Sequence, residues 1–471
     1  MNRRDFLRRS ALLASGVAFV APIRAAEADF PVVRVPEEKR RFKSRAVERT
    51  IETIRARIGN PELGWMFENC FPNALDTTVD FDDSGNRPDT FVMTGDTDAM
   101  SLRDSAMQVW PYLPFMRNDS TLKQLIAGVI NRQTRCILKD PYANAFCKND
   151  RQASPWKDDF TEMSPGVYER KWALDSLCYP VRLAFHYWKT TKDRTPFDES
   201  WRFAMLRIVR TLREQQRKDS SGPYRFQRRT QIQGDTLAGD GVGHRAKPMG
   251  LIYSMFRPSD DATLFPLLVP SNFLAVGSLR QGAELLSRIH GDSESAAQCQ
   301  ALADEVERAL REHAVVIHRK YSRILPYEID GYGNCYCMDE GAVPSLLSLP
   351  YFDVISPGSP LYLNTRRFIL SDSNPYYCVG KAASGPGGPR VGRDMIWPLA
   401  LLAQALTSND DLEVRRCLLT LQKTHAGTGF MHEAFHKDDP SKFTRPWFPA
   451  ANTLFGELVL KSFRERPHVL N

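Results

Sequence analysis

The chain has 471 residues, of which 42% are hydrophobic and 25% are charged, and its formal net charge is +7 at pH 7. Residues 1–26 carry five arginines and one aspartate, so the rest of the chain has a net charge of +3. It shows neither a lysine-rich stripe nor a basic-aromatic repeat, which argues against a nucleic-acid partner. We therefore expect a ligand that is neutral or only weakly charged.

The first predicted element is a twin-arginine export signal in residues 1–26. Arg3 and Arg4 precede an apolar run from Ala11 to Val20, and small residues follow around Ala26. The run has the length of a signal h-region and is too short to span a membrane. We expect residues 27–471 to form a single globular domain that is periplasmic or secreted, without stable membrane insertion after signal removal.

Nine cysteines are scattered along the chain rather than arranged in CxxC pairs, and their number is odd. This pattern does not favour a zinc site. A twin-arginine substrate usually folds before export in a reducing compartment, so we expect buried free thiols rather than a disulfide framework. Cys335 and Cys337 are the pair closest in sequence.

Helical patterns dominate the chain after the signal. Pro36 suits a first-turn position, and the apolar-striped run 41–58 ends at Gly59, Asn60 and Pro61. The same reasoning predicts helices at the ranges 122–138, 175–190 and 199–217.

Two helical hairpins are predicted in the second half of the chain. Ser271 is expected to cap a helix that reaches Ile289, and Gly291 and Asp292 then turn into a second helix over about 294–316. A buried helix at 394–406 and an amphipathic one at 412–424 repeat the pattern. Strand signals are sparse, so we predict an all-α toroid of helical hairpins. A solenoid is the structural alternative, but the sequence shows no fixed-period repeat.

The segment 256–262, FRPSDDA, places two adjacent acids between apolar and aromatic runs. Partial desolvation of Asp260 or Asp261 would raise its carboxyl pKa toward a value suited to proton donation. The alternative interpretation is that Asp260 caps a turn, because Ser-Asp clusters after proline are common in turns.

A partner acid is predicted at Glu433, in the segment 427–435, GTGFMHEAF. One carboxylic acid can protonate a glycosidic oxygen while a second carboxylate activates water on the opposite face of the sugar, which gives inversion. His432 could orient either group. Taken alone, Glu433 and His432 could also be a surface pair. Aromatic residues make up 10% of the chain, and several lie beside acids or arginines in predicted loops, as sugar-binding sites require.

Six blocks in collinear order span most of the chain after the signal. They are TFVMTGDTDAMSLRDSAMQVWPY, YERKWALDSLCYP, KPMGLIYSMFRPSDDATLFPLLVPSN, PSLLSLPY, IWPLALLAQALTS and GTGFMHEAFHKDDPSKFTRPWF. Together they resemble glycoside hydrolase family 125, the exo-α-1,6-mannosidases. The resemblance implies a single (α/α)6 barrel with a pocket at one rim, an inverting mechanism, no cofactor and no catalytic metal.

Carried over residue by residue, the resemblance places the general acid in the motif Ser259-Asp260-Asp261 and the general base at Glu433. We favour Asp260 as the acid, although the motif alone leaves Asp261 open. The substrate would be a mannose-containing oligosaccharide or glycan with a terminal α-1,6-linked mannose. The candidates for holding sugar hydroxyls are Asp96, Arg103, Asp104, Asp175, Arg257, Asp261 and His432. Arg103 and Asp104 could instead form a structural ion pair, and Asp175 could cap its helix.

The chain departs from the family pattern at four positions. Ser101 stands where the pattern has Trp, Ala173 where it has an acid, Ala342 where it has Asn, and Arg390 where it has His. These departures motivate an alternative, a glycan-binding homologue with weakened catalysis.

A second alternative is a polysaccharide lyase on the same type of toroid, because Tyr376, Arg390 and Arg393 could serve β-elimination on an acidic sugar. Sequence patterns leave open whether the site is a closed pocket or an open groove, and which oligomeric state the protein adopts.

Overall fold

Polar side chains cap the first turn of many of the helices. In the computed structural model, which describes residues 30–471, the side chains of Asn60, Asp119, Asp198, Asp292 and Asp410 each accept a hydrogen bond from a backbone N–H in the first turn of the following helix. The α-helices of this part of the chain are α1 (Arg45–Arg55), α2 (Pro61–Cys70), α3 (Asn73–Thr77), α4 (Leu102–Val109), α5 (Ser120–Lys139), α6 (Asp175–Thr191), α7 (Glu199–Glu214), α8 (Val269–Leu285), α9 (Ser293–His313), α10 (Pro360–Ile369), α11 (Pro398–Leu406), α12 (Asp411–Thr424) and α13 (Pro449–Glu465).

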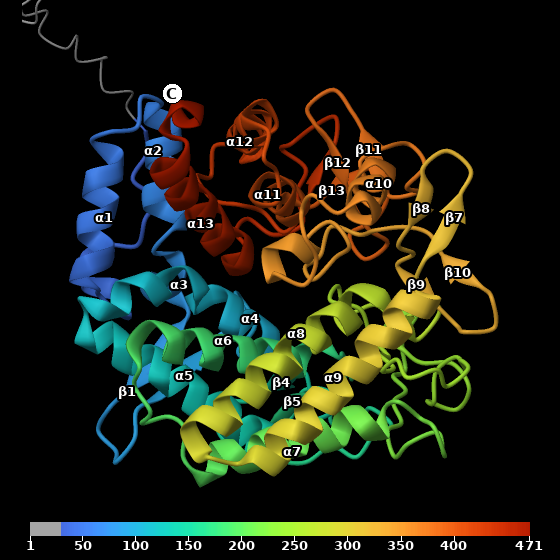
Figure 1. The fold of residues 1–471 in the computed structure, drawn as a ribbon. Helices are drawn as coiled ribbons and strands as arrows, with labels where there is room; N and C mark the ends of the chain where they lie inside the picture. Colours follow the sequence, from blue (N-terminus) through green and yellow to red (C-terminus); the bar gives the residue numbers. More distant parts are fainter. Residues whose placement is uncertain (1–29) are drawn as a thin grey trace, which may run out of the picture. The chain divides into compact units, whose positions relative to one another are not determined.

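An inner set of helices is buried on nearly every side. Every residue of α4 is buried, and so are seven of the nine residues of α11. A helix that is enclosed all round belongs to the core of a protein. Contacts join α11 to α13, α13 to α4, α4 to α6 and α6 to α8, and α8 also contacts the 3₁₀ helix Leu349–Phe352. These elements follow one another around the inside of the toroid (Figure 1).

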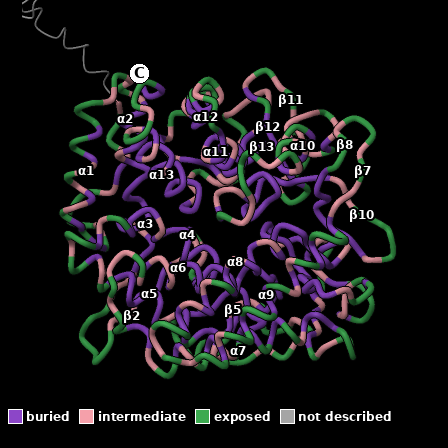
Figure 2. The backbone as a smooth tube through the Cα atoms, viewed as in Figure 1, coloured by how far each residue is buried: buried purple, intermediate pink, exposed green. Residues whose placement is uncertain are grey.

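An outer set of helices buries one stripe each. In α9 the buried positions Cys299, Leu302, Val306 and Leu310 recur every three or four residues, which places them on the face toward α8. Helices α5 and α12 likewise cover the inner helices α6 and α11, and α7 packs beside α5 and α9. Exposed residues lie mainly on the outside of the fold (Figure 2). Residues 32–471 form one compact unit with the predicted architecture, an (α/α)6 toroid.

The strands are short and lie in the loops at the helix ends. They pair antiparallel in two three-stranded sheets, β3–β4–β5 and β6–β9–β10, and in two-stranded pairs. Their bounds are β1 (Val79–Asp82), β2 (Asp89–Val92), β3 (Met100–Ser101), β4 (Ala145–Phe146), β5 (Val167–Glu169), β6 (Leu267–Leu268), β7 (Val316–His318), β8 (Ser322–Ile324), β9 (Glu328–Ile329), β10 (Cys335–Tyr336), β11 (Tyr377–Val379), β12 (Ser384–Pro386), β13 (Met395–Ile396) and β14 (Phe435–His436).

Three helix starts differ from the sequence prediction. The helix predicted over 41–58 begins at Arg45, where Ser44 caps it by accepting from Val47 N. Ser271 does not cap α8, because the helix already begins at Val269 with Pro270 in its first turn. The helix predicted from 394 begins only at Pro398, since Met395 and Ile396 pair with His436 and Phe435 as β13 and β14. This pairing holds the loop before α11 against the loop that carries Glu433.

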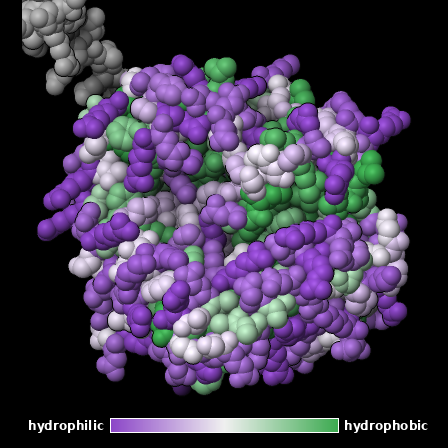
Figure 3. All heavy atoms as spheres, in the orientation of Figure 1, coloured by the Kyte–Doolittle hydropathy of each residue, from purple (hydrophilic) through white to green (hydrophobic). Residues whose placement is uncertain are grey.

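The nine cysteines are free thiols, and six of them are buried. Within residues 30–471, the helices include none that is long and apolar enough to cross a bilayer. Hydrophilic residues cover much of the face seen in Figure 3, and hydrophobic ones gather near its middle, above α8 and α9. The export signal predicted for residues 1–26 lies outside the described residues.

Candidate active site

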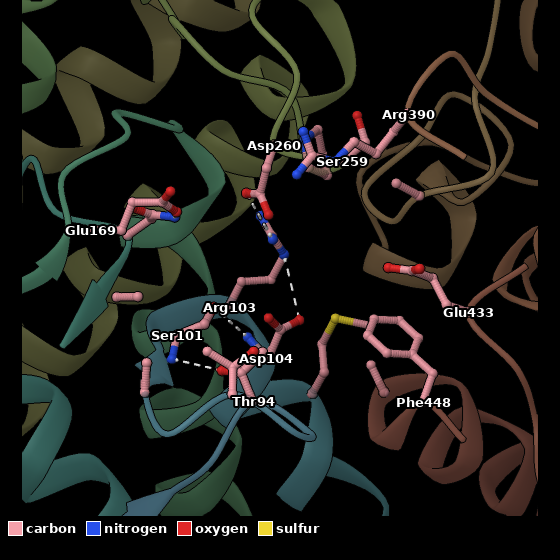
Figure 4. A pocket seen from close by; sticks show the side chains of 18 of the residues that line it. Thr94, Ser101, Arg103, Asp104, Glu169, Ser259, Asp260, Arg390, Glu433 and Phe448 are labelled. Atoms are coloured by element: carbon pink, nitrogen blue, oxygen red, sulfur yellow. Dashed lines mark hydrogen bonds and ion pairs between the residues drawn. The ribbon is translucent and has the colours of Figure 1, made fainter. Parts of the chain in front are cut away.

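A cavity of about 240 Å³ opens among the loops at one end of the inner helices. We call it the first cavity (Figure 4). Its lining comes from segments far apart in the sequence, which the ring of helices brings together. Among the lining residues are four carboxylates, Asp104, Glu169, Asp260 and Glu433, and four aromatic residues, Trp156, Tyr168, Trp397 and Phe448. Carboxylates and aromatic faces in one small space suit a sugar ring.

Arg103 forms one wall of the first cavity and joins three acids. Its Nη1 donates to Asp175 Oδ2 at 3.0 Å, and its Nε and Nη2 lie 3.7 Å from carboxylate oxygens of Asp104 and Asp260. Burial alone would lower the pKa of Arg103, but the carboxylates of Asp104, Asp175 and Asp260 hold it above its ordinary value. Arg103 is therefore a fixed cation beside Asp260.

The start of α4 sets the position of this arginine. Ser101 is the N-cap, and its Oγ accepts from the backbone N–H of Asp104 at 3.1 Å. Asp175 is fully buried behind Arg103, where desolvation raises the pKa of its carboxyl. It contacts the first cavity only through Arg103, so its observed role is to position that side chain.

A tight turn presents Asp260 to the first cavity. Asp260 has a backbone φ of +68°, a left-handed conformation that aspartate tolerates better than most residues. The turn is held by hydrogen bonds from Asp260 N to Arg257 O at 2.9 Å and from Arg257 N to Asp261 O at 2.8 Å. Lys171 also donates to the backbone oxygen of Asp260 at 3.2 Å. The side chain of Asp260 remains 37% exposed.

Asp261 does not line the first cavity. Its Oδ1 lies 3.5 Å from Arg390 Nη1, and it faces a separate space on the other side of the turn. Burial raises the pKa of Asp261, against the opposing charges of Arg390 and Arg257. The structure thus separates the two acids that the sequence left as alternatives, and only Asp260 shares a cavity with Glu433.

Glu433 enters the first cavity from the opposite side to Asp260, next to Phe448 (Figure 4). Its side chain is 19% exposed, and Oε1 lies 3.7 Å from Arg445 Nε. Gly427 and Gly429, both at positive φ, form the turn that leads to it. The arrangement places two carboxylates across a space that is open to a ligand.

Three further predicted residues lie outside the lining of the first cavity. Asp96 is an exposed neighbour of Arg445 at 3.7 Å. Arg257 donates to buried Glu328 at 2.6 Å. His432 is buried and stacks on Phe443 at 3.9 Å, and its Nδ1 lies 3.0 Å from the backbone oxygen of Arg445. His432 therefore supports the loop that carries Glu433.

Sequence reasoning missed Glu169, Arg445 and, as a residue of the sugar site, Arg390. All three line the first cavity. Arg390 had stood out as a departure from the family pattern and as a candidate of the lyase alternative, whereas Glu169 and Arg445 lie inside resembling blocks and were not singled out. Of the lyase candidates, Tyr376 and Arg393 are not among the lining residues. Within the part of the chain that the structure describes, no three His, Cys, Asp or Glu side chains are grouped to hold a metal ion.

Comparison with known proteins gives one family. The model of the family described as "Metal-independent alpha-mannosidase (GH125)" matches residues 60–460. The meiotically up-regulated gene 157 protein of Schizosaccharomyces pombe is 39% identical over an alignment of 462 residues that covers 93% of this chain and 90% of that protein.

Solved structures agree with this assignment. A metal-independent α-mannosidase of Streptococcus pneumoniae, in a non-productive complex with α-1,6-mannobiose, matches with a TM-score of 0.87 and 39% identity. The match covers 90% of this chain and 100% of that one. A family 78 rhamnosidase of Bacillus sp. GL1 matches with a TM-score of 0.51 and 10% identity over 86% of this chain and 35% of that one. At that identity the likeness shows the shared fold alone.

Proposed function

The chain belongs to glycoside hydrolase family 125, the metal-independent α-mannosidases, and from this premise we propose that it releases terminal α-1,6-linked mannose with inversion of configuration. The observation that carries the proposal is the placement of Asp260 and Glu433 on facing sides of one cavity. The α-1,6-mannobiose bound to the S. pneumoniae relative supports the choice of linkage.

In the proposed reaction Asp260 is the general acid and Glu433 is the general base. Asp260 donates its proton to the glycosidic oxygen as the bond to the anomeric carbon breaks. Glu433 takes a proton from a water molecule, whose oxygen attacks the anomeric carbon from the opposite face. The product is mannose in the β configuration, and Asp260 and Glu433 exchange their protonation states until solvent restores them.

Neighbouring cations shape the two roles. Arg103, beside Asp260 and Asp104, can bind sugar hydroxyls and hold the carboxylates in register. Arg445, whose Nε lies 3.7 Å from Glu433 Oε1, places a positive charge beside the proposed base. The residues on the chain thereby supply acid, base and orientation.

The size of the first cavity supports exo action. A volume of about 240 Å³ is below the range of roughly 300–1,000 Å³ that is typical of sites for drug-sized ligands, so we assign to it one terminal sugar. Three of the four departures from the family pattern, Ser101, Ala342 and Arg390, line this cavity, whereas Ala173 is buried outside it. These departures make a non-catalytic glycan-binding protein the second outcome to test.

Proton NMR of the purified protein with α-1,6-mannobiose tests the function directly. The expected result is release of β-mannose before mutarotation, and turnover that is abolished in Glu433→Gln. Asp438→Asn, a change at a half-buried position on the same segment and outside the first cavity, is the control that should retain activity. Binding of mannobiose without release of mannose would overturn the hydrolase assignment and favour the glycan-binding alternative.

We also propose that the protein is exported by the twin-arginine signal in residues 1–26 and acts in the periplasm or outside the cell. The paired Arg3 and Arg4 and the following apolar run support this localisation. Replacement of both arginines by lysine should leave the protein in the cytoplasmic fraction. Unchanged export of that double variant would contradict the proposal.

A further inference from the structure

A second cavity, of about 690 Å³, lies on the other side of the Asp260–Asp261 turn. Its polar lining includes Gln233, His244, Asp261, Tyr336, Tyr376 and Arg390. Arg390 lines both cavities, and Asp260 and Asp261 line the first and the second, respectively. The two spaces are therefore neighbours with a thin partition, made by one turn and one arginine side chain.

The top of this partition is open to solvent. The side chains of Asp260 and Arg390 are 37% and 33% exposed, in contrast to the 9% of Asp261. Figure 4 shows Arg390 beside Ser259 at the edge of the first cavity. Both side chains at this edge of the partition are thus accessible to a bound chain molecule.

The proposed reaction determines which part of the substrate extends past Asp260. The general acid must contact the glycosidic oxygen, so the bond that breaks lies at Asp260, with the terminal mannose in the first cavity. The leaving saccharide begins at the same oxygen and continues past Asp260. The second cavity, with almost three times the volume of the first, is next to that point.

The wall of the second cavity suits a neutral saccharide. The hydroxyl oxygens of Tyr336 and Tyr376 lie 3.0 Å apart, so they can donate to and accept from sugar hydroxyls. Positive charge is compensated, because Arg257 is paired with Glu328 at 2.6 Å and Arg390 with Asp235 at 3.0 Å. The 3.5 Å contact between Arg390 and Asp261 is longer than a good hydrogen bond, so the Asp261 carboxylate has acceptor capacity left for a ligand.

We propose that the second cavity binds the leaving part of the substrate, as a site for at least two neutral sugar residues on the reducing side of the scissile bond. The inference rests on the proposed function, since it uses Asp260 as the acid. It makes oligosaccharides longer than a disaccharide the preferred substrates, recognised by Tyr336, Tyr376 and Arg390.

The test compares kcat/KM for α-1,6-mannobiose, α-1,6-mannotriose, α-1,6-mannotetraose and an aryl α-mannoside whose leaving group carries no sugar. In the wild-type protein kcat/KM should rise from the disaccharide to the tetrasaccharide. Tyr376→Phe and Tyr336→Phe should each lower kcat/KM for the tetrasaccharide about 3- to 10-fold, which corresponds to the loss of one hydrogen bond. The kcat/KM of each variant for the aryl mannoside should stay within about twofold of the wild-type value.

Tyr377→Phe is the matched control, because it makes the same chemical change at the next position, outside both cavities. This variant should have the wild-type kcat/KM for all four substrates. The aryl mannoside also reports folding, because a variant that fails to fold loses its activity on that substrate as well. If one of the two tyrosine variants fails to fold, the other provides the test.

Equal kcat/KM for the three oligosaccharides, or an equal loss on the tetrasaccharide and the aryl mannoside in both folded variants, would overturn the inference and leave the proposed function intact. Failure to release mannose from any of the substrates would instead overturn the proposed function.

Discussion

Replacement of Asp260 by Asn removes the proposed proton donor with little change to the turn that carries it. Asn keeps the size of Asp and tolerates the φ of +68° at this position, so the turn is retained. The lost ion pair with Arg103 spans 3.7 Å at a side chain that is 37% exposed, and it should contribute no more than about 1 kcal/mol to folding. Arg103 keeps Asp104 and Asp175 as partners. The variant should therefore fold.

The expected effect depends on the leaving group. A sugar hydroxyl leaves poorly without a proton, so kcat/KM for α-1,6-mannobiose should fall about 10²- to 10⁴-fold, or about 2.7–5.4 kcal/mol in the barrier. A dinitrophenyl α-mannoside needs no such proton, and its kcat/KM should fall by less than about tenfold.

The assay is steady-state kinetics of wild-type, Asp260→Asn and Asp261→Asn proteins on both substrates. Asp261→Asn is the matched control, because that carboxylate faces the second cavity. In Asp261→Asn the fold-loss of kcat/KM should be more similar for the two substrates than it is in Asp260→Asn. Equal losses on the two substrates in Asp260→Asn, or a larger difference between substrates in Asp261→Asn, would refute the assignment of the acid.

Three further predictions concern stability, pH and thiol chemistry. Ser101→Ala removes the N-cap of α4 and should lower the free energy of unfolding by about 0.5–2 kcal/mol in urea titrations; an unchanged midpoint would contradict the capping role. Burial raises the pKa of Glu340 to about 7, so the folded state holds this proton more tightly than the unfolded state, and stability is lost as pH rises from about 4 to about 7 at up to ~1.4 kcal/mol per pH unit. The unfolding free energy of Glu340→Gln should fall less between pH 5 and pH 8 than that of wild type, and parallel pH curves would exclude this account. In the native protein iodoacetamide should label exposed Cys335 first. Burial raises the pKa of Cys70 and Cys178 and should protect both thiols until the protein is denatured. Peptide mass spectrometry that found Cys70 labelled as fast as Cys335 would contradict the described burial.

Local signals were enough to predict most helices. The α7 helix begins at Glu199, as predicted, because its cap, Asp198, lies next to it in the chain. The α8–α9 turn at Gly291 and Asp292 was also predicted correctly, because a left-handed glycine and a capping aspartate are properties of a few consecutive residues. The start of α11 was placed too early, since the pairing of Met395 with His436 is a contact between distant segments.

The amino-acid sequence determined the toroid, the family and the short motifs that carry Asp260 and Glu433. Helix periodicity, caps and motifs are local features, so they can be recognised from a few consecutive residues without knowledge of the residues that contact them in the fold. Only the tertiary structure decided that Asp260, rather than Asp261, faces Glu433. That choice depends on one left-handed residue, which directs successive carboxylates into different cavities. Arg445 and Arg390 also lie in the site because of the tertiary structure. The packing of the helices into a toroid decides which loops meet, and no short stretch of sequence specifies these contacts between distant segments.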